Sequence, residues 1–487
     1  MPSAQNAIIG AGHVPFSDED DLDTGMDAAP GISVAAVMES ASDDFTTRVA
    51  IALCLANGCD AMETMSFGYV VPQLGAKLAG LEHVAAAVFV GMLLGGVISG
   101  HAADRVGKQA LLVGMLRLEA VSGICGATVS TGQMLAFWRG LSGFAIGAAV
   151  PPLFNLAEEL LEPEPRRHRW LNLIAASFLV GSAIDATLAW LLLGLLGLSW
   201  RVFYMVASVV PLFVAELISR WVPEAPSFLL IRGRRSQLQV ELRKLSPNGE
   251  PAADLAFRLQ YHEVTMSSTL YSLLSGPWRG SLAMISSICC SMAFAWYGLS
   301  TWLLLIFQDV GIENEYFAAL VFALSGGPGA LVCLCLVKYV NAGRLLAVFL
   351  FLTGSCCVAL SAVAFFSPAH NGNDVPQLAR SPSRLSPVIA VFVVCLFNSV
   401  STGVFNVLVT LWASPYPADL QALAVGFQSS WMRIGSIAAQ LVDGAMVKAH
   451  KTGEMALVSA ALLMTASGVS LCLNTTNNST QFIFLCA

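Results

Sequence analysis

Two acidic residues, Asp60 and Glu63, stand in the middle of the first long apolar stretch of the chain. On a helix, residues three apart lie on the same face, so both carboxyl groups would point into one space. A carboxylate in hydrocarbon costs several kcal/mol and usually faces a cavity or a partner. Burial beside like charge also favours the binding of a proton. We interpret the pair as a proton- or cation-binding site; a structural pair bonded to neighbouring helices is the alternative.

Three further charged residues fall within apolar stretches. Arg139 is followed by Gly143 and Gly147, whose i+4 spacing permits close contact between helices. Arg139 either extends to the membrane interface or faces the interior as a counter-charge. Asp185 is central in its stretch, and Arg433 lies among serines and glycines that suit the wall of a cavity. We expect these three residues to balance the charge of a bound ion or solute.

Aromatic side chains gather in the seventh apolar stretch, at Trp296, Tyr297 and Trp302. Such side chains bind organic solutes by stacking or by cation–π contact. Tryptophan and tyrosine in membrane proteins also serve as interfacial anchors or as packing residues. The sequence leaves both roles open for these three.

Other kinds of chemistry are not indicated. The chain has 12 cysteines, but the closely spaced ones lie in apolar runs, without two Cys-x-x-Cys pairs at zinc spacing. We interpret them as small apolar side chains. No Ser-His or Cys-His pairing has a motif context, and no glycine-rich phosphate loop is present. We therefore expect that the protein is not an enzyme and that it has no cofactor, no metal site and no nucleic-acid partner.

The elements that must position these residues follow from composition. Of 487 residues, 56% are hydrophobic and 12% are charged, whereas soluble domains average about 25% charged residues. Long, continuously apolar blocks indicate helices, because backbone groups in lipid must be satisfied within their own segment. Spanning helices are predicted at 49–73, 83–103, 109–130, 133–160, 170–196, 201–222, 280–307, 315–338, 343–366, 386–412, 420–447 and 453–473.

Polar segments divide these helices into two sets of six. We predict a disordered acidic tail (1–47), a first bundle (48–222), a basic connector (223–278), a second bundle (279–474) and a tail (475–487). Lysine and arginine concentrate in the connector and in the loops after the second and fourth helices. By the positive-inside rule the connector and both termini are cytoplasmic. Either the plasma membrane or a vesicle membrane fits this topology.

A weak internal repeat supports duplication of a six-helix unit. The loop after the second helix reads Gly100-His-Ala-Ala-Asp104-Arg105-Val-Gly107-Lys108, and the equivalent place after the eighth helix reads Lys338-Tyr-Val-Asn-Ala-Gly343-Arg344. The second copy keeps a glycine and a basic residue but has Val340 in place of the aspartate. We therefore expect an all-α membrane protein with twelve transmembrane helices in two pseudo-symmetric six-helix bundles.

Several ordered motifs resemble those of the major facilitator superfamily. The Gly100–Lys108 loop is similar to its motif between helices two and three, and Arg139 with its two glycines to its helix-four motif. The segment that begins Pro223-Glu224-Ala-Pro226 resembles the motif after helix six in the sugar-porter and organic-ion branches. Four further segments look most like the synaptic vesicle glycoprotein 2-like branch and its organic-ion and aromatic-acid relatives: Asp60–Glu63 with Pro72, Ser199–Phe203, Trp296–Trp302 and Tyr416–Asp419 with Gly426-Phe427.

This resemblance covers about residues 45–450 and implies alternating access between two bundles around a central site. It gives a gating role to the motif residues Gly100, Asp104, Arg105, Gly107 and Lys108, and to Glu159, Arg166 and Glu224, which match the ends of helices four and six. It links Arg139 to proton coupling. Ser414 and Gln421 replace a glutamate and an arginine of the branch, which weakens the second gate.

Two functions remain in view. The first is a monomeric carrier of a small organic solute, an organic ion or aromatic acid, by facilitated or proton-coupled transport. In it Asp60 and Glu63 carry protons or a cation, and Trp296, Tyr297 and Trp302 contact the solute. The second is a transporter-like vesicle protein with a receptor or regulatory role and little transport, which the degraded second motif would favour.

Overall fold

The computed structural model describes residues 42–75, 80–161, 164–245, 270–337, 339–365, 385–413 and 415–473, and these form helices joined by short connections. Most of the predicted acidic tail, the middle of the connector and the C-terminal tail lie outside the described residues. The first helix begins at Asp43, inside the segment that the sequence assigned to the tail. The prediction of an all-α membrane fold is confirmed.

Twelve of the described helices are long, between 20 and 33 residues each. The first six are α2 (Asp43–Gly75), α3 (Leu81–Val106), α4 (Lys108–Thr128), α5 (Gly132–Leu160), α6 (Glu164–Ala189) and α7 (Trp200–Trp221). The second six are α12 (Arg279–Val310), α13 (Glu315–Leu336), α14 (Ala342–Phe365), α15 (Leu385–Ala413), α16 (Ala418–Lys448) and α17 (Thr452–Leu471). A π-helical turn, η1 (Trp190–Leu195), extends α6. Each predicted span coincides with one of these helices.

Ten of the twelve are apolar enough to cross a membrane by length and composition. Helices α2 and α16 fall short, because both carry polar side chains along their middle. In α2 these include Asp60 and Glu63, and in α16 they include Arg433 and Asp443. Such residues are tolerated at membrane depth where they face protein or a polar interior. The two long helices without a sufficiently apolar window are therefore the ones to search for a functional site.

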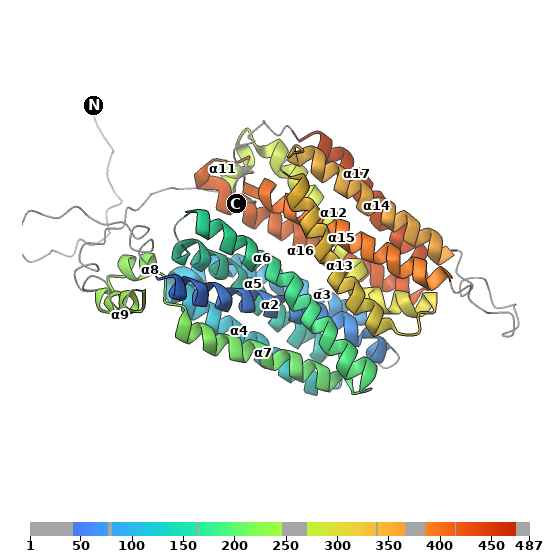
Figure 1. The fold of residues 1–487 in the computed structure, drawn as a ribbon, viewed down its shortest axis with the longest axis horizontal. Coiled ribbons are helices and arrows are strands. Elements are labelled where there is room, and N and C mark those ends of the chain that lie inside the picture. Colours follow the sequence, from blue (N-terminus) through green and yellow to red (C-terminus); the bar gives the residue numbers. More distant parts are fainter. Residues whose placement is uncertain are drawn as a thin grey trace, which may run out of the picture.

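The long helices form two groups with the same internal packing (Figure 1). In the first group α2 packs on α6 and α7, α3 on α5, and α4 on α5 and α7. In the second, α12 packs on α16 and α17, α13 on α15, and α14 on α15 and α17. Between the groups α2 meets α12, α3 meets α16, and α6 meets α13. The second group thus repeats the first helix for helix, which is the pseudo-symmetry that the weak sequence repeat predicted.

Glycines set the closest helix contact of the first group, between α3 and α5. A methyl group at Gly91 or Gly95 of α3 would collide with the backbone of α5, and one at Gly143 or Gly147 of α5 would collide with the backbone of α3. Small residues allow membrane helices to approach this closely and to gain van der Waals contact in place of hydrophobic driving force. This packing fixes the position of Arg139, one turn before Gly143.

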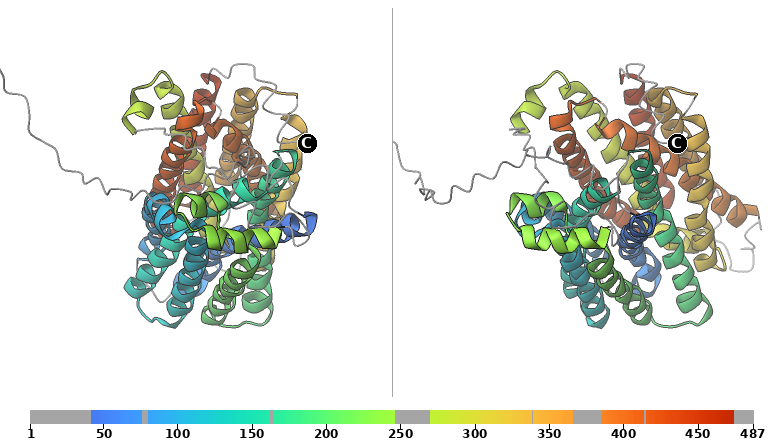
Figure 2. Two further views of the ribbon diagram at one scale, coloured as in Figure 1. Left: turned by 90° about the vertical axis from the view of Figure 1, so that its left-hand side faces the viewer. Right: turned by 60° about the vertical axis from the view of Figure 1, so that its left-hand side comes forward.

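The two groups touch mainly at one end of the molecule. Lys448 of α16 pairs with Glu82 of α3 there, and Trp190 of η1 packs against Phe317 of α13. The opposite end carries the connector helices α8 (Pro226–Ile231), α9 (Arg235–Leu245) and α11 (Leu270–Ser275). Figure 2 shows α8 and α9, in light green, lying across the ends of the first group. We call these the contact end and the connector end.

Candidate functional site

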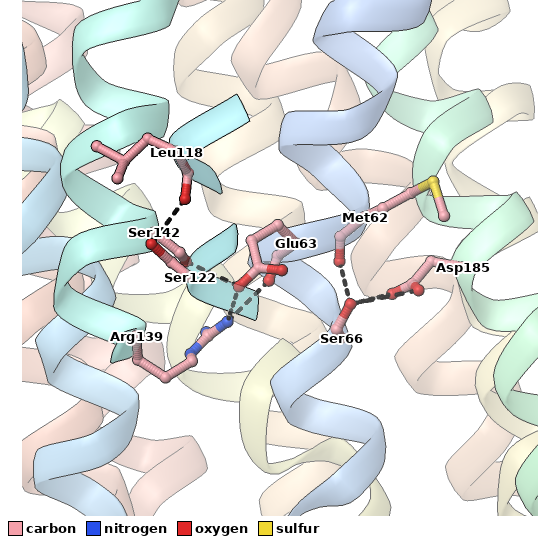
Figure 3. Close-up of polar contacts among 8 residues, drawn as sticks. All are labelled: Met62, Glu63, Ser66, Leu118, Ser122, Arg139, Ser142 and Asp185. Atoms are coloured by element: carbon pink, nitrogen blue, oxygen red, sulfur yellow. Dashed lines mark hydrogen bonds and ion pairs between the residues drawn. The ribbon is translucent and has the colours of Figure 1, made fainter. Parts of the chain in front are cut away.

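Arg139 and Glu63 form a buried ion pair at the centre of the first group (Figure 3). Arg139 Nη1 donates to Glu63 Oε1 at 3.0 Å and to the Glu63 carbonyl oxygen at 2.9 Å, and Ser142 Oγ donates to Glu63 Oε1 at 2.8 Å. Arg139 is 2% exposed and Glu63 4% exposed. Of the two alternatives for Arg139, the inward one is the one observed. The guanidinium also lies over the ring of Phe67, 5.1 Å from its centroid.

Asp185 of α6 lies on the other side of α2. Ser66 Oγ donates to the Met62 carbonyl oxygen and lies 3.3 Å from both carboxylate oxygens of Asp185. This hydroxyl is the hydrogen-bonding group that the structure places against the fully buried carboxyl group. Asp185 is therefore held against α2, one turn from Glu63.

Asp60 does not share the environment of Glu63, although the two are on one helix face. Its carboxyl group faces Glu119 of α4, and the two interact directly. Neither carboxyl group accepts a hydrogen bond from a donor among the described residues. Asp60 also interacts electrostatically with Arg433, which belongs to α16 of the second group. Asp60 thus lies within electrostatic range of the second group, whereas Glu63 is paired within the first.

Glu119 is the residue that sequence reasoning missed. Its i, i+2 spacing from Arg117 correctly indicates that the two side chains point apart: Arg117 is exposed and pairs with Glu216 of α7, while Glu119 is buried. The signal available in the sequence was the i, i+2 spacing itself. If Arg117 is exposed, an acid on the opposite face of the helix must point into the bundle. Nothing in the spacing indicated which residue it would meet.

Arg433 lies beside an aromatic cluster on α12. Arg433 Nη1 donates to Tyr297 Oη at 3.4 Å, and the residue as a whole is partly exposed. Tyr297 packs edge-on against Phe89 of α3, with 4.8 Å between ring centroids, and against Trp296. Trp296 Nε1 donates to Asn398 Oδ1 of α15 at 3.1 Å. The structure therefore brings one cation and two aromatic side chains together next to the interface between the groups.

Trp302 is separated from that cluster. It is almost completely buried and packs against Gly444 of α16, next to Glu82, at the contact end. A side chain larger than hydrogen at position 444 would collide with its ring. Trp302 packs in the closed contact between the groups, which is the packing role that the sequence left open for it.

The predicted gating residues lie at the connector end. Lys108 Nζ pairs with Glu159 Oε2 at 2.8 Å, and Ser227 at the start of α8 donates its N–H and its hydroxyl to the same carboxylate. The Asp104 carbonyl oxygen accepts from Arg232. Gly100 and Arg105 are exposed. The Arg166 side chain lies outside the described part of the chain.

Glu224 caps the start of α4. Its carboxylate accepts from the backbone N–H groups of Gln109 and Ala110, at 3.0 and 3.3 Å. Free N–H groups and the helix dipole make a helix start favourable for an anion. Gly107 precedes α4 with φ of 111°, and a Cβ there would collide with the Glu224 carboxylate. The acid after helix six thus holds the motif loop to the connector.

The comparisons with known proteins decide the family. The model of the Major Facilitator Superfamily matches residues 53–440. The chain belongs to this superfamily. Among relatives, it is 26% identical to the niacin transporter NiaP of Acinetobacter baylyi over 74% of this chain and 77% of that one, and 26% identical to a gallate transporter of Pseudomonas putida over 80% and 82%. The predicted resemblance is confirmed.

A solved structure of the Major Facilitator Superfamily shows the same fold. The inward-open conformation of the xylose transporter XylE from E. coli covers 90% of this chain and 99% of its own, with a TM-score of 0.68 and 14% identity. Membership makes this chain a transmembrane transporter that works by alternating access: its two helix groups open a central site to one side of the membrane and then to the other. Among the described residues, no three histidine, cysteine or acidic side chains gather as metal ligands, and no disulfide joins the described cysteines.

Proposed function

We propose that the protein carries a small aromatic carboxylate across the membrane together with a proton. The observation that carries the proposal is Arg433, a partly exposed cation beside Tyr297 and facing Asp60 of the other helix group. A guanidinium has five N–H donors in a planar fork that matches a carboxylate. The contacts of Arg433 leave donors for a ligand, and the rings of Tyr297 and Trp296 offer an aromatic solute surfaces for stacking.

The buried acids supply the second half of the proposal. Glu63 is neutralised by Arg139, but no described cation of the first group forms an ion pair with Asp60 or Glu119. Buried acids of this kind bind protons, as aspartate and glutamate residues in the membrane helices of pumps and transporters do. We assign the solute to the Arg433 side of the interface and the proton to the Asp60 side. Arg139 with Glu63 and Asp185 then forms the framework that orients α2.

The relatives support an aromatic carboxylate. Niacin and gallate, for which two of them are named, are both aromatic rings with one carboxyl group. A bidentate arginine and a nearby ring recognise those two features. The regulatory alternative is not favoured, because the two relatives named above are transporters.

The sidedness of the molecule belongs to the proposal too. Arginines 232, 234 and 235 and Lys108 stand at the connector end, and positive charge marks the cytoplasmic face. The contact end is then external, and the described conformation has its closed contact on the outside. We propose a monomer with cytoplasmic termini, in which Lys448 and Glu82 help to close the outer face.

The test is uptake by purified protein in liposomes loaded at neutral pH and diluted into more acidic buffer. Labelled nicotinate and gallate are expected to accumulate, and a quaternary ammonium and xylose are not. Arg433→Gln should abolish carboxylate uptake, and Arg220→Gln should not, because Arg220 is exposed and pairs with Glu216, far from the proposed solute site. Uptake of the ammonium alone would contradict the proposal, and uptake of no probe would favour the regulatory alternative.

A further inference from the structure

Asp60 and Glu119 form an isolated pair of acids inside the first helix group. They come from different helices, α2 and α4, and are 3% and 1% exposed. None of their four carboxylate oxygens accepts a hydrogen bond from a donor among the described residues. The two groups interact directly with one another. Native interiors rarely leave four acceptor atoms in this state.

Two charged carboxylates are strongly disfavoured in such a place unless a cation lies close enough to balance them. An unpaired carboxylate away from water is strongly disfavoured, and a second one beside it adds repulsion. One proton removes both problems. The protonated acid donates an O–H···O⁻ hydrogen bond to the other, which is among the strongest hydrogen bonds in proteins. The pair then has one negative charge spread over two groups and one internal hydrogen bond.

The groups around the pair determine which cation balances that charge. The ionisable side chains that face it or its neighbours come from five helices: Cys59 and Glu63 of α2, Arg139 of α5, Asp185 of α6, Tyr204 of α7 and Arg433 of α16. Arg139 is engaged by Glu63, so its charge is already matched. The remaining cation is Arg433. It comes from the other helix group and would also meet the solute.

We propose that Asp60 and Glu119 bind one shared proton, and that this pair is the proton-loading site of transport, with Glu119 as a partner in it. The proposal deepens the proposed function and rests on it for its role in transport, but the shared proton itself is a property of the pair. No bond other than O–H is made or broken: the proton arrives from one side of the membrane and leaves to the other.

Arg433 connects this proton to the solute. When a carboxylate solute pairs with Arg433, the cation is less available to Asp60, and the pair keeps its shared proton. When the solute leaves, Arg433 again attracts Asp60 and favours loss of a proton. Binding of the two is therefore linked, and by reciprocity the proton strengthens binding of the solute to the same extent. Because Asp60 and Arg433 belong to different helix groups, this exchange also alters the attraction between the groups.

Infrared spectroscopy of the full-length protein tests the shared proton without any solute. The wild type should show the C=O stretch of a protonated carboxylic acid that disappears as pH is raised. Glu119→Gln and Asp60→Asn should each remove this same band, because a single proton serves both acids. Glu216→Gln should leave it, since Glu216 is exposed and paired with Arg220. Loss of two different bands in the two variants, or of none, would overturn the proposal.

Transport tests the role of the pair. An inward gradient of about one pH unit supports roughly tenfold accumulation of a monoanion by one-proton symport. Glu119→Gln should lower that ratio to unity while it still exchanges external for internal labelled nicotinate, because exchange needs no net proton movement. Gradient-driven accumulation by Glu119→Gln at the wild-type ratio would overturn the role. If Glu119→Gln does not fold, Asp60→Asn is measured in both assays with the same expectation.

The two proposals fail in different ways. A wild type that carries neither nicotinate nor gallate contradicts the proposed function, while the infrared bands still decide whether the proton is shared. If Glu119→Gln and Asp60→Asn both accumulate nicotinate normally and keep the infrared band, the shared proton is overturned and the proposed function is not.

Discussion

Arg139 of α5 and Glu63 of α2 are joined by an ion pair, with 3.0 Å between Nη1 and Oε1, in a place where both side chains are almost fully buried. The arginine also donates to the backbone carbonyl oxygen of Glu63, and Ser142 completes the partners of the carboxylate. A buried pair contributes little net stability when it is intact, but the loss of one partner is costly because the other charge remains.

Arg139→Gln is therefore expected to destabilise the purified protein by about 3–5 kcal/mol, seen as a lower midpoint of thermal unfolding in detergent. The double variant Arg139→Gln with Glu63→Gln should recover much of this loss, because no unpaired charge is left behind. Arg220→Gln is the matched control: it removes an exposed pair with Glu216, and such pairs contribute about 0–1 kcal/mol. Equal effects of Arg139→Gln and Arg220→Gln would contradict the buried pair.

The glycines between α3 and α5 give a second prediction. Gly143→Ala adds a methyl group that collides with the backbone of Val88, and overpacking of this kind costs about 1–3 kcal/mol. Thermal unfolding measures the effect. Gly114→Ala on α4 is the control, because open space surrounds Gly114 and alanine favours a helix by roughly 0.5–1 kcal/mol over glycine. A Gly143→Ala protein as stable as the control would mean that the helices are farther apart.

Glu224 gives a third prediction, on local order. Glu224→Ala leaves the N–H groups of Gln109 and Ala110 without their acceptor, at a cost of about 1 kcal/mol. Amide hydrogen exchange at the start of α4 should become several times faster. Glu224→Gln keeps an acceptor oxygen and should lie between Glu224→Ala and wild type, and Glu158→Ala, at an exposed acid near the same end, should have no effect. Unchanged exchange in Glu224→Ala would show that this contact does not hold the loop.

Arg433→Lys separates charge from geometry in the proposed solute site. Lysine keeps the positive charge facing Asp60 but lacks the planar fork that binds a carboxylate by two hydrogen bonds. We expect KM for nicotinate to rise about tenfold, the effect of losing one hydrogen bond to a charged group, while accumulation at saturating nicotinate still follows the pH gradient. A rise in KM of equal size for the control Arg220→Lys would contradict a direct role.

The architecture could be predicted from the sequence because its signals are long and redundant. Apolar blocks of about 20 residues indicate spanning helices, and the pair of glycines after Arg139 indicates a close helix contact. The start of α2 at Asp43 was not predicted, because the polar first turns of a helix that extends beyond the apolar core resemble a tail. The π-helical turn after α6 also has no distinct sequence signal, since Trp190–Leu195 is as apolar as the helix before it.

The site was predicted less completely. Charges in apolar stretches indicated the candidates Asp60, Glu63, Arg139, Asp185 and Arg433, since each is costly to bury for no purpose. Their partners depend on how helices rotate against one another, and that rotation is set by packing over many residues. The i, i+3 spacing thus put Asp60 and Glu63 on one face correctly, but one meets Arg139 and the other meets Glu119 of α4. Trp302 was likewise grouped with Trp296 by sequence, although it packs at the contact end.

The direction of pH dependence follows from the coupling. A proton-binding site open to the outside fills as the external pH falls, so uptake of nicotinate should increase on acidification and fade as the external medium becomes alkaline. One proton with one monoanion carries no net charge. Uptake should therefore be insensitive to a membrane potential imposed with potassium and valinomycin, and a strong response to potential would contradict the one-to-one ratio.

The most direct test of the central claim, that a proton moves with the solute, follows the proton itself. Liposomes that contain the protein and a pH-sensitive dye are placed in medium of the same pH, and nicotinate is added outside. The account predicts acidification of the interior that depends on nicotinate and is absent in Glu119→Gln, although that variant still exchanges nicotinate. Uptake of labelled nicotinate by the wild type at normal rates with no change of internal pH would contradict it.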